Sequence, residues 1–140
     1  MRFNVGLNKA NKKKERYKLK AYKLLRILKS DGQLHPLFIN KSVPTPIGKW
    51  MQAECHPTKG FAVRCGWHCC FIPYAPHLKL TLANGETRVW CEVEIENWSS
   101  YDRPESQGGA WILAQRMKIN RILTIGEVID LLKENGKEVA

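Results

Sequence analysis

The chain has 140 residues, of which 44% are hydrophobic and 26% charged, and its formal net charge is +10. This composition is typical of a globular protein of one-domain size and excludes the disordered and fibrous classes. Every apolar run is shorter than the roughly 18 residues of a membrane span, and the basic N-terminus lacks the apolar region of a secretory signal. We therefore expect a cytoplasmic protein with no membrane partner.

The positive charge is concentrated at the start of the chain. Residues 1–30 contain eight Lys and three Arg against one Glu, so their net charge of +10 equals that of the whole protein. We expect a basic flexible arm over residues 1–16 and a single α+β domain over residues 17–140. Such an arm is typical of a protein that binds nucleic acid or a nucleoprotein, although an arm that only aids solubility is the alternative. The expected phosphate contacts are Lys12, Lys13, Lys14, Arg16, Lys18 and Lys20.

The segment YKLKAYKLLRILKSDGQLHPLFI fits two secondary-structure patterns. Its apolar residues follow helical spacing, with Gly32 as the C-cap of the helix. Other apolar residues alternate, and Asp31-Gly32 is a favoured hairpin turn. We favour two strands, over about residues 20–29 and 33–40, and keep the helix as the alternative.

The next segment, KSVPTPIGKWMQAE, is interrupted by two prolines and a glycine. We expect a loop over an open sheet edge, with one short helix over IGKWMQAE as an alternative. The following GFAVRCGWHCCFI alternates as in a strand. One face of this strand is almost wholly apolar and comprises Phe61, Val63, Cys65, Trp67, Cys69 and Phe71.

The clearest local signal is LKLTLANGETRVWCEVEI, in which Asn84-Gly85 is a favoured type I′ turn. After the turn every other residue is apolar, which predicts a hairpin with one buried face. The residues of this face are Val89, Cys91, Val93 and Ile95.

The C-terminal part predicts a strand and then a helix. AWILAQRMKINRIL is expected to form one strand or two bent strands. In TIGEVIDLLKENG, Thr124 is an N-cap, Glu127 completes a capping box and Gly136 is the C-cap. The expected apolar stripe comprises Ile125, Val128, Ile129 and Leu132. The fold class is therefore α+β, a bent antiparallel sheet of five to seven strands with a short C-terminal helix and a basic N-terminal arm.

Three cysteines and two histidines lie within RCGWHCCFIPYAPH, which raises the question of a zinc site. If residues 61–72 form a strand, Cys65 and Cys69 face one side while His68 and Cys70 face the other, so no tetrahedral set converges. An odd number of cysteines, two of them adjacent, also disfavours a disulfide framework. We expect no metal and no disulfide, with Cys65, Cys69 and Cys91 as small core residues. A cysteine nucleophile activated by a nearby histidine is an alternative.

Four segments follow one another along the chain: TPIGKW, GWHCCFIPYAPH, VWCEVEI and WILAQRMKINRILTIGEV. In this order they resemble a family of small proteins and domains carried by bacteriophages and conjugative elements, notably of gut bacteria. The resemblance runs from about Tyr22 to Leu132 and includes the Gly66-Trp67-His68 core and the Trp90-Cys91-Glu92 strand. It implies an accessory or host-interaction role.

A more distant resemblance is to ADP-ribosyltransferases, and it rests on GWHCCFIPYAPHL followed by VWCEVEI. It places His68 where that fold has a ring that stacks on nicotinamide, and it implies NAD as cofactor. The pocket would then be lined by Trp67, Tyr74 and His77. The nearest carboxylates that could hold the ribose are Glu92, Glu94 and Glu105.

Three functions follow from these observations. The first is a phage or mobile-element accessory protein that binds nucleic acid or a nucleoprotein through the basic arm and needs no cofactor. The second is an ADP-ribosyltransferase-like enzyme centred on His68. The third is a protein-binding inhibitor of a host defence system, with a host protein as partner.

Overall fold

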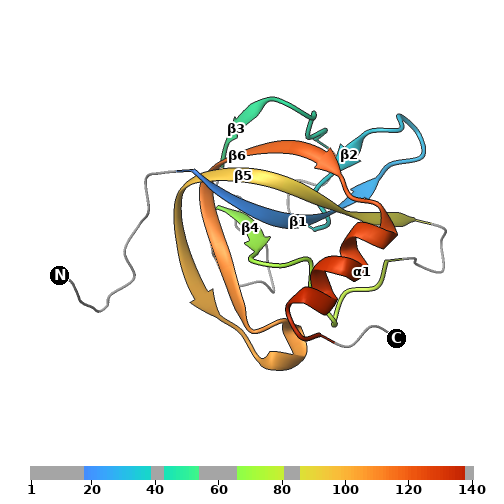
Figure 1. Ribbon diagram of the computed structural model, residues 1–140. Helices are drawn as coiled ribbons and strands as arrows, with labels where there is room; N and C mark the ends of the chain where they lie inside the picture. Colours follow the sequence, from blue (N-terminus) through green and yellow to red (C-terminus); the bar gives the residue numbers. More distant parts are fainter. Residues whose placement is uncertain (1–17, 39–42, 54–65, 81–85, 138–140) are drawn as a thin grey trace.

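The computed structural model describes residues 18–38, 43–53, 66–80 and 86–137. These ranges contain β1 (Leu19–Ile27), β2 (Leu34–His35), β3 (Trp50–Gln52), β4 (Trp67–Cys70), β5 (Thr87–Asp102), the 3-10 helix η1 (Glu105–Gln107), β6 (Ala110–Ile122) and α1 (Ile125–Glu134). All strand pairs are antiparallel, and α1 packs beside the sheet (Figure 1). The predicted α+β class, with a bent antiparallel sheet and a short C-terminal helix, is confirmed. The predicted arm over residues 1–16 lies outside the described residues.

The strand pairings close into a ring, which makes the bent sheet a small barrel. β1 pairs with β5, β5 with β6, β6 with β4, and β4 returns to β1. The last contact is short, because β1 and β4 are in register at one pair only, Tyr22 with Cys70. β4 begins after Gly66, where φ is 143° and a Cβ atom would lie 3.2 Å from the carbonyl oxygen of Ala114 on β6. A glycine is therefore required where β4 meets β6.

β5 and β6 form a long hairpin that bends sharply near its middle. Ile95 and Trp98 both contact the interior, as do Ala114 and Met117, so the inward alternation skips one residue on each strand. Asn97 lies in this gap with a positive φ of 51°, a conformation that asparagine adopts more readily than most residues. The bend lets the first part of β6 pair with β4 and the second part with β3.

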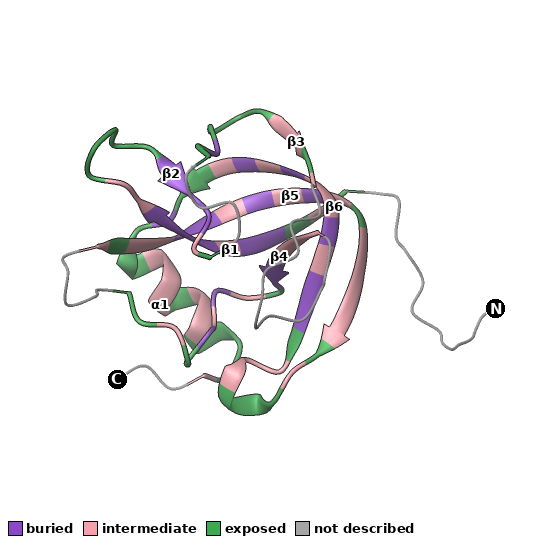
Figure 2. Cartoon of the chain, turned by 180° about the vertical axis from the view of Figure 1, so that it is seen from behind, coloured by how far each residue is buried: buried purple, intermediate pink, exposed green. Residues whose placement is uncertain are grey.

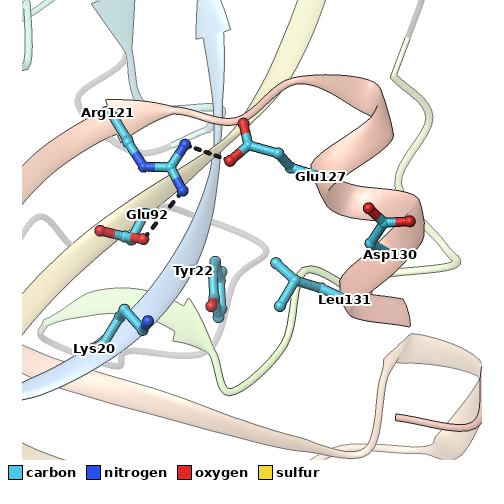
Figure 3. Close-up of a pocket in the computed structure, with 7 residues that line it drawn as sticks. All are labelled: Lys20, Tyr22, Glu92, Arg121, Glu127, Asp130 and Leu131. Carbon is cyan, nitrogen blue, oxygen red and sulfur yellow. Dashed lines mark hydrogen bonds and ion pairs between the residues drawn. The ribbon is translucent and has the colours of Figure 1, made fainter. Parts of the chain in front are cut away.

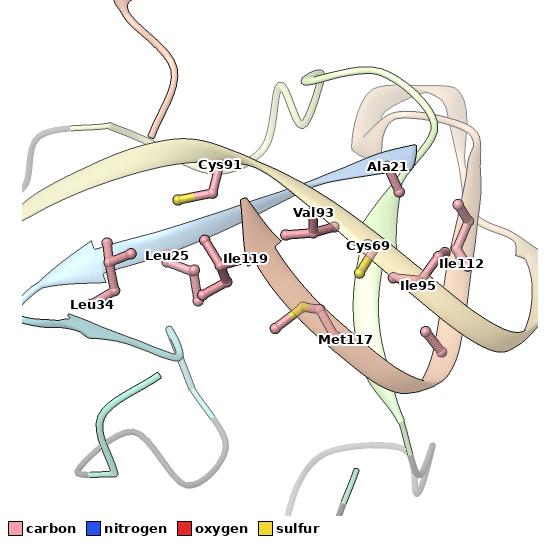
Figure 4. Packing of buried hydrophobic residues seen from close by; sticks show 11 residues of the cluster. Ala21, Leu25, Leu34, Cys69, Cys91, Val93, Ile95, Ile112, Met117 and Ile119 are labelled. Atoms are coloured by element: carbon pink, nitrogen blue, oxygen red, sulfur yellow. The ribbon is translucent and has the colours of Figure 1, made fainter. Parts of the chain in front are cut away.

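The barrel interior is filled by small and branched side chains, together with Met117, from five strands, as Figure 4 shows. In Figure 2 these buried positions alternate with less buried ones along β5 and β6, as expected for strands with one face inward. The fully buried members include Ala21, Leu25, Cys69, Cys91, Val93, Ile95, Ile112, Ala114, Met117 and Ile119.

A second apolar cluster lies on the outside of the barrel, under α1 and the chain after β4. It contains Tyr22, Leu24, Cys70, Trp90 and Trp111, with Val128 and Leu131 of α1 packed against it. β1 is therefore buried on both faces, which explains why its sequence also fits helical spacing. Among the described residues, no helix is both long and apolar enough to cross a membrane.

Both ends of α1 are set by local signals. The Glu127 amide donates to Thr124 Oγ1 at 3.1 Å while the Thr124 amide donates to the Glu127 carboxylate at 2.9 Å, so the predicted capping box is confirmed. Asn135 is the C-cap, and Gly136 follows it in the left-handed conformation with φ 72°. The predicted apolar stripe is partly wrong, because Ile125 is 75% exposed and the helix packs through Val128 and Leu131.

The predicted strand pair at the start of the body is confirmed, although β2 is shorter than expected. Leu28 and Gln33 are hydrogen-bonded across the turn at 3.0 Å. Pro36 has no amide hydrogen to continue the ladder beyond His35. The Asn84-Gly85 turn lies outside the described residues. Residues 78–80 are not a strand, although the Arg88 amide of β5 donates to the Leu80 carbonyl at 2.8 Å, as in the predicted hairpin. The strand partners of β5 among the described residues are β1 and β6.

The alternative of a short helix over IGKWMQAE is also wrong. Trp50–Gln52 forms β3, which pairs with β6 and is preceded by a parallel bridge from Ile47 to Ile119. The reason is tertiary, because the second part of β6 has bent away from β4 and its hydrogen-bonding groups need another partner. The expected loop is also wrong over residues 50–52, which form β3, although the segment does cover an edge of the sheet by pairing with β6.

Candidate nucleic-acid interface

The two described members of the predicted phosphate-contact set lie at the start of β1. Lys18 and Lys20 are both exposed, and Lys20 is in register with Glu94 of β5. The Lys18 ammonium lies 5.6 Å from the centre of the Trp50 ring of β3. Lys12, Lys13, Lys14 and Arg16 lie outside the described residues.

The outer face of β5 and β6 is a ladder of cross-strand ion pairs. Lys118 contacts Glu94 at 3.0 Å, Arg116 is paired with Glu96, and Arg121 contacts Glu92 at 3.5 Å. Glu94 and Glu96 are directly opposite Lys118 and Arg116 in the strand register. These pairs neutralise most of the charge on this part of the face. Lys18 and Lys20, in contrast, form no ion pair with any described carboxylate.

An open pocket of about 220 Å³ lies between the outer face and α1 (Figure 3). Arg121 crosses it and contacts Glu92 on one side and Glu127 on the other, the latter at 2.6 Å. The Thr124 amide, followed by Arg121, lowers the pKa of Glu127, and Glu127 in turn raises the pKa of Arg121. These charged groups therefore stabilise the start of α1. The pocket is lined by Lys20, Tyr22, Glu92, Arg121, Glu127, Asp130 and Leu131.

His68, the predicted nicotinamide contact, faces the outside of the barrel on β4. Its Nδ1 is 2.9 Å from the Tyr101 hydroxyl, and the two rings meet edge to face at 6.0 Å. Trp67 points to the opposite face, where its indole nitrogen donates to the Met51 carbonyl at 3.2 Å. His68 and Trp67 therefore cannot form one side of a common pocket.

The other residues of the predicted nicotinamide pocket have different neighbours. The His77 ring packs edge-on against Trp111, with 5.9 Å between ring centres, and Tyr74 has the Lys137 ammonium 4.8 Å from its ring. Burial, and then the positive charge of Arg103, lowers the pKa of His77.

The three carboxylates considered for the ribose are also held by other groups. Glu92 contacts Asn120 and Arg121, while Glu94 contacts Lys118. Glu105 contacts Lys137 at 3.5 Å. Each carboxylate is thus engaged on β6 or near the C-terminus.

The three described cysteines are buried thiols. Cys69 and Cys91 lie in the interior, as predicted, and Cys70 lies in the outer cluster. Burial raises the pKa of Cys69 to about 11 and that of Cys91 to about 12, so neither is a thiolate nucleophile near neutral pH. Within the described ranges, no three His, Cys, Asp or Glu side chains are grouped to hold a metal ion. Cys65, the third predicted core cysteine, lies outside those ranges.

One cation lies on the interior side of β1. Lys23 Nζ donates to the His68 carbonyl at 2.8 Å and lies 5.9 Å from the Trp67 ring centre, and burial lowers its pKa. Because β1 and β4 share a single pair in register, this bond adds a second connection across the closing seam. Part of the positive charge of residues 1–30 therefore stabilises the fold and is not available to a ligand.

The sequence patterns did not single out Trp50, Arg116, Lys118 or Lys23. Arg116 and Lys118 could have been found, because they alternate with the buried Met117 in a predicted strand. Lys23 likewise breaks the apolar alternation of its strand. Trp50 had no such signal, since its segment was expected to be a loop.

No family model matches the chain, and no curated protein or solved structure matches it. The resemblances to phage and mobile-element proteins and to ADP-ribosyltransferases stay predictions.

Proposed function

We propose that the protein binds nucleic acid, alone or within a nucleoprotein, through its basic N-terminal residues, as an accessory protein of a phage or mobile element in the host cytoplasm. The observation that carries the proposal is the position of Lys18 and Lys20. These two lysines continue the basic sequence onto the outer face of the barrel, and neither has a carboxylate partner in the part of the chain that the structure describes.

The other cations of the body support this interpretation by contrast. Arg26 is buried and contacts Glu86 at 3.1 Å, and Lys118 and Arg121 are held by glutamates on β5. Their charge is largely balanced within the fold. The unbalanced charge is on the N-terminal residues, where a polyanion would find cations that lose no protein partner on binding.

Contacts of this kind are made to phosphates, so they carry affinity but little sequence information. Each neutralised phosphate releases condensed counterions, which makes the affinity fall steeply as the salt concentration rises. We therefore expect binding that varies little with nucleotide sequence and strongly with salt.

The test compares two triple-alanine variants that remove the same net charge. One replaces Lys12, Lys13 and Lys14; the control replaces Lys29, Lys79 and Lys133, which are exposed on the body. Fluorescence anisotropy with labelled oligonucleotides over a salt series gives the binding constant and its salt dependence.

The arm variant should bind at least about tenfold more weakly at low salt. The negative slope of log K against log salt should become smaller in magnitude by about 2–3, because three phosphate contacts are lost. The control should retain the slope of the unmodified protein. Equal losses in both variants would show that only net charge matters and would contradict binding through the arm.

A further inference from the structure

Trp50 is surrounded by three cations, two from β6 and one from the residue that precedes β1. The Arg116 guanidinium lies 4.7 Å from its ring centre, Lys118 Nζ 5.5 Å and Lys18 Nζ 5.6 Å. The Trp50 side chain is half-buried, so part of the ring remains accessible. An accessible aromatic ring among cations is the arrangement by which proteins hold single-stranded nucleic acid.

The strand register explains how these groups meet. Trp50 is opposite Lys118, Lys118 is opposite Glu94, and Glu94 is opposite Lys20. One row of side chains therefore crosses β3, β6, β5 and β1 on the outer face. Lys18 directly precedes β1, and its ammonium lies beside the Trp50 ring. The last residues of the basic segment therefore reach this ring.

The cations around Trp50 are of two kinds. Arg116 and Lys118 are fixed by Glu96 and Glu94, so they hold the ring in place and contribute little net charge. Lys18, Lys20 and Lys49 are exposed and have no carboxylate partner among the described side chains. Their ammonium groups are therefore available to the phosphates of a bound strand.

We propose that Trp50 is a stacking site for a base of single-stranded nucleic acid, whose neighbouring phosphates contact Lys18, Lys20 and Lys49. This inference rests on the proposed nucleic-acid function and assigns it a strand class. In a duplex the faces of the bases are already stacked on one another, whereas a single strand can present a base to an aromatic ring.

The experiment uses the full chain with Trp50→Leu and Trp50→Phe. Leucine keeps an apolar side chain at this position of β3 but cannot stack, whereas phenylalanine retains an aromatic face. Phe71→Ala is the matched control, because Phe71 is a half-exposed aromatic that contacts Trp98. The probes are a labelled oligothymidine, an oligouridine and a hairpin duplex, and circular dichroism verifies the fold of each variant.

Trp50→Leu should bind both single strands about tenfold more weakly, while its duplex affinity changes by less than about twofold. Trp50→Phe should remain within about threefold of the unmodified protein, and Phe71→Ala should be unchanged. Equal behaviour of the leucine and phenylalanine variants on the single strands would overturn the inference, as would equal losses on duplex and single strand.

The outcomes for the two proposals are distinguishable. If the arm variant loses binding while Trp50→Leu retains it, the arm function holds and the stacking site is wrong. If the unmodified protein binds none of the three probes, both are wrong.

Discussion

The interior and the outer face of the barrel are built from alternate residues of the same strands, yet they handle charge in opposite ways. Among the residues that the structure describes, the interior admits one cation, Lys23, and holds it by a hydrogen bond to the His68 carbonyl. The outer face carries many charges but pairs most of them across β5 and β6. Charge that is available for binding is therefore identified by cations without a carboxylate partner, and the number of cations alone does not identify it.

The largest expected contrast is between two isoleucines of β6. Ile119 is fully buried in the interior, whereas Ile122 is 39% exposed. Ile119→Ala should lower the free energy of unfolding by about 2–5 kcal/mol, because it removes buried methyl groups and leaves a cavity. Ile122→Ala is the matched control and should cost less than about 1 kcal/mol. Urea unfolding measures both, and similar losses would mean that the interior described for β6 is wrong.

The next contrast concerns pH, because the interior holds thiols. Burial raises the pKa of Cys69 from its usual 9.0 to about 11, so the folded protein retains a proton that the unfolded chain loses. The contribution of this thiol to the free energy of unfolding is therefore fully present below pH 9. It decreases by up to about 3 kcal/mol as the pH rises toward 11, because the unfolded chain gives up the proton more readily. The lowered pKa of Lys23 acts in the opposite direction, but Cys91 adds to the loss.

We therefore expect the urea midpoint to fall between pH 9 and 11. The fall should be smaller in Cys69→Ala, which lacks this thiol while retaining that of Cys91. Val93→Ala shortens another fully buried side chain without removing a titrating group, and it should retain the pH dependence of the unmodified protein. A midpoint that is constant over this range would show that Cys69 is accessible to water.

Much of this fold could be predicted from local sequence. The capping box of Thr124 and Glu127 and the alternation of β5 depend on neighbours in the chain, and both are present in the structure. The identity of strand partners depends on distant residues. β5 pairs with β1 because the barrel closes, and no pattern within LKLTLANGETRVWCEVEI indicates this.

The candidate site was harder to predict for the same reason. Lys18 and Lys20 were found because charge accumulates locally in the sequence. Trp50 joins them only through the register of four strands, including a β3 of three residues. Such a short strand has no period of its own, and its conformation is imposed by β6.

A double-mutant cycle on one outer ion pair tests whether these pairs stabilise the fold or only balance charge, and we expect its effect to be small. Lys118 and Glu94 are 26% and 30% exposed, so water screens their attraction. A double-mutant cycle with Lys118→Met and Glu94→Gln should give a coupling of about 0.2–1 kcal/mol that decreases at high salt. A coupling above about 2 kcal/mol that persists in salt would show that the outer face stabilises the barrel as strongly as buried contacts do. A small coupling would mean that the ladder mainly keeps Lys118 beside Trp50 and leaves the net positive charge to Lys18, Lys20 and the residues that precede them.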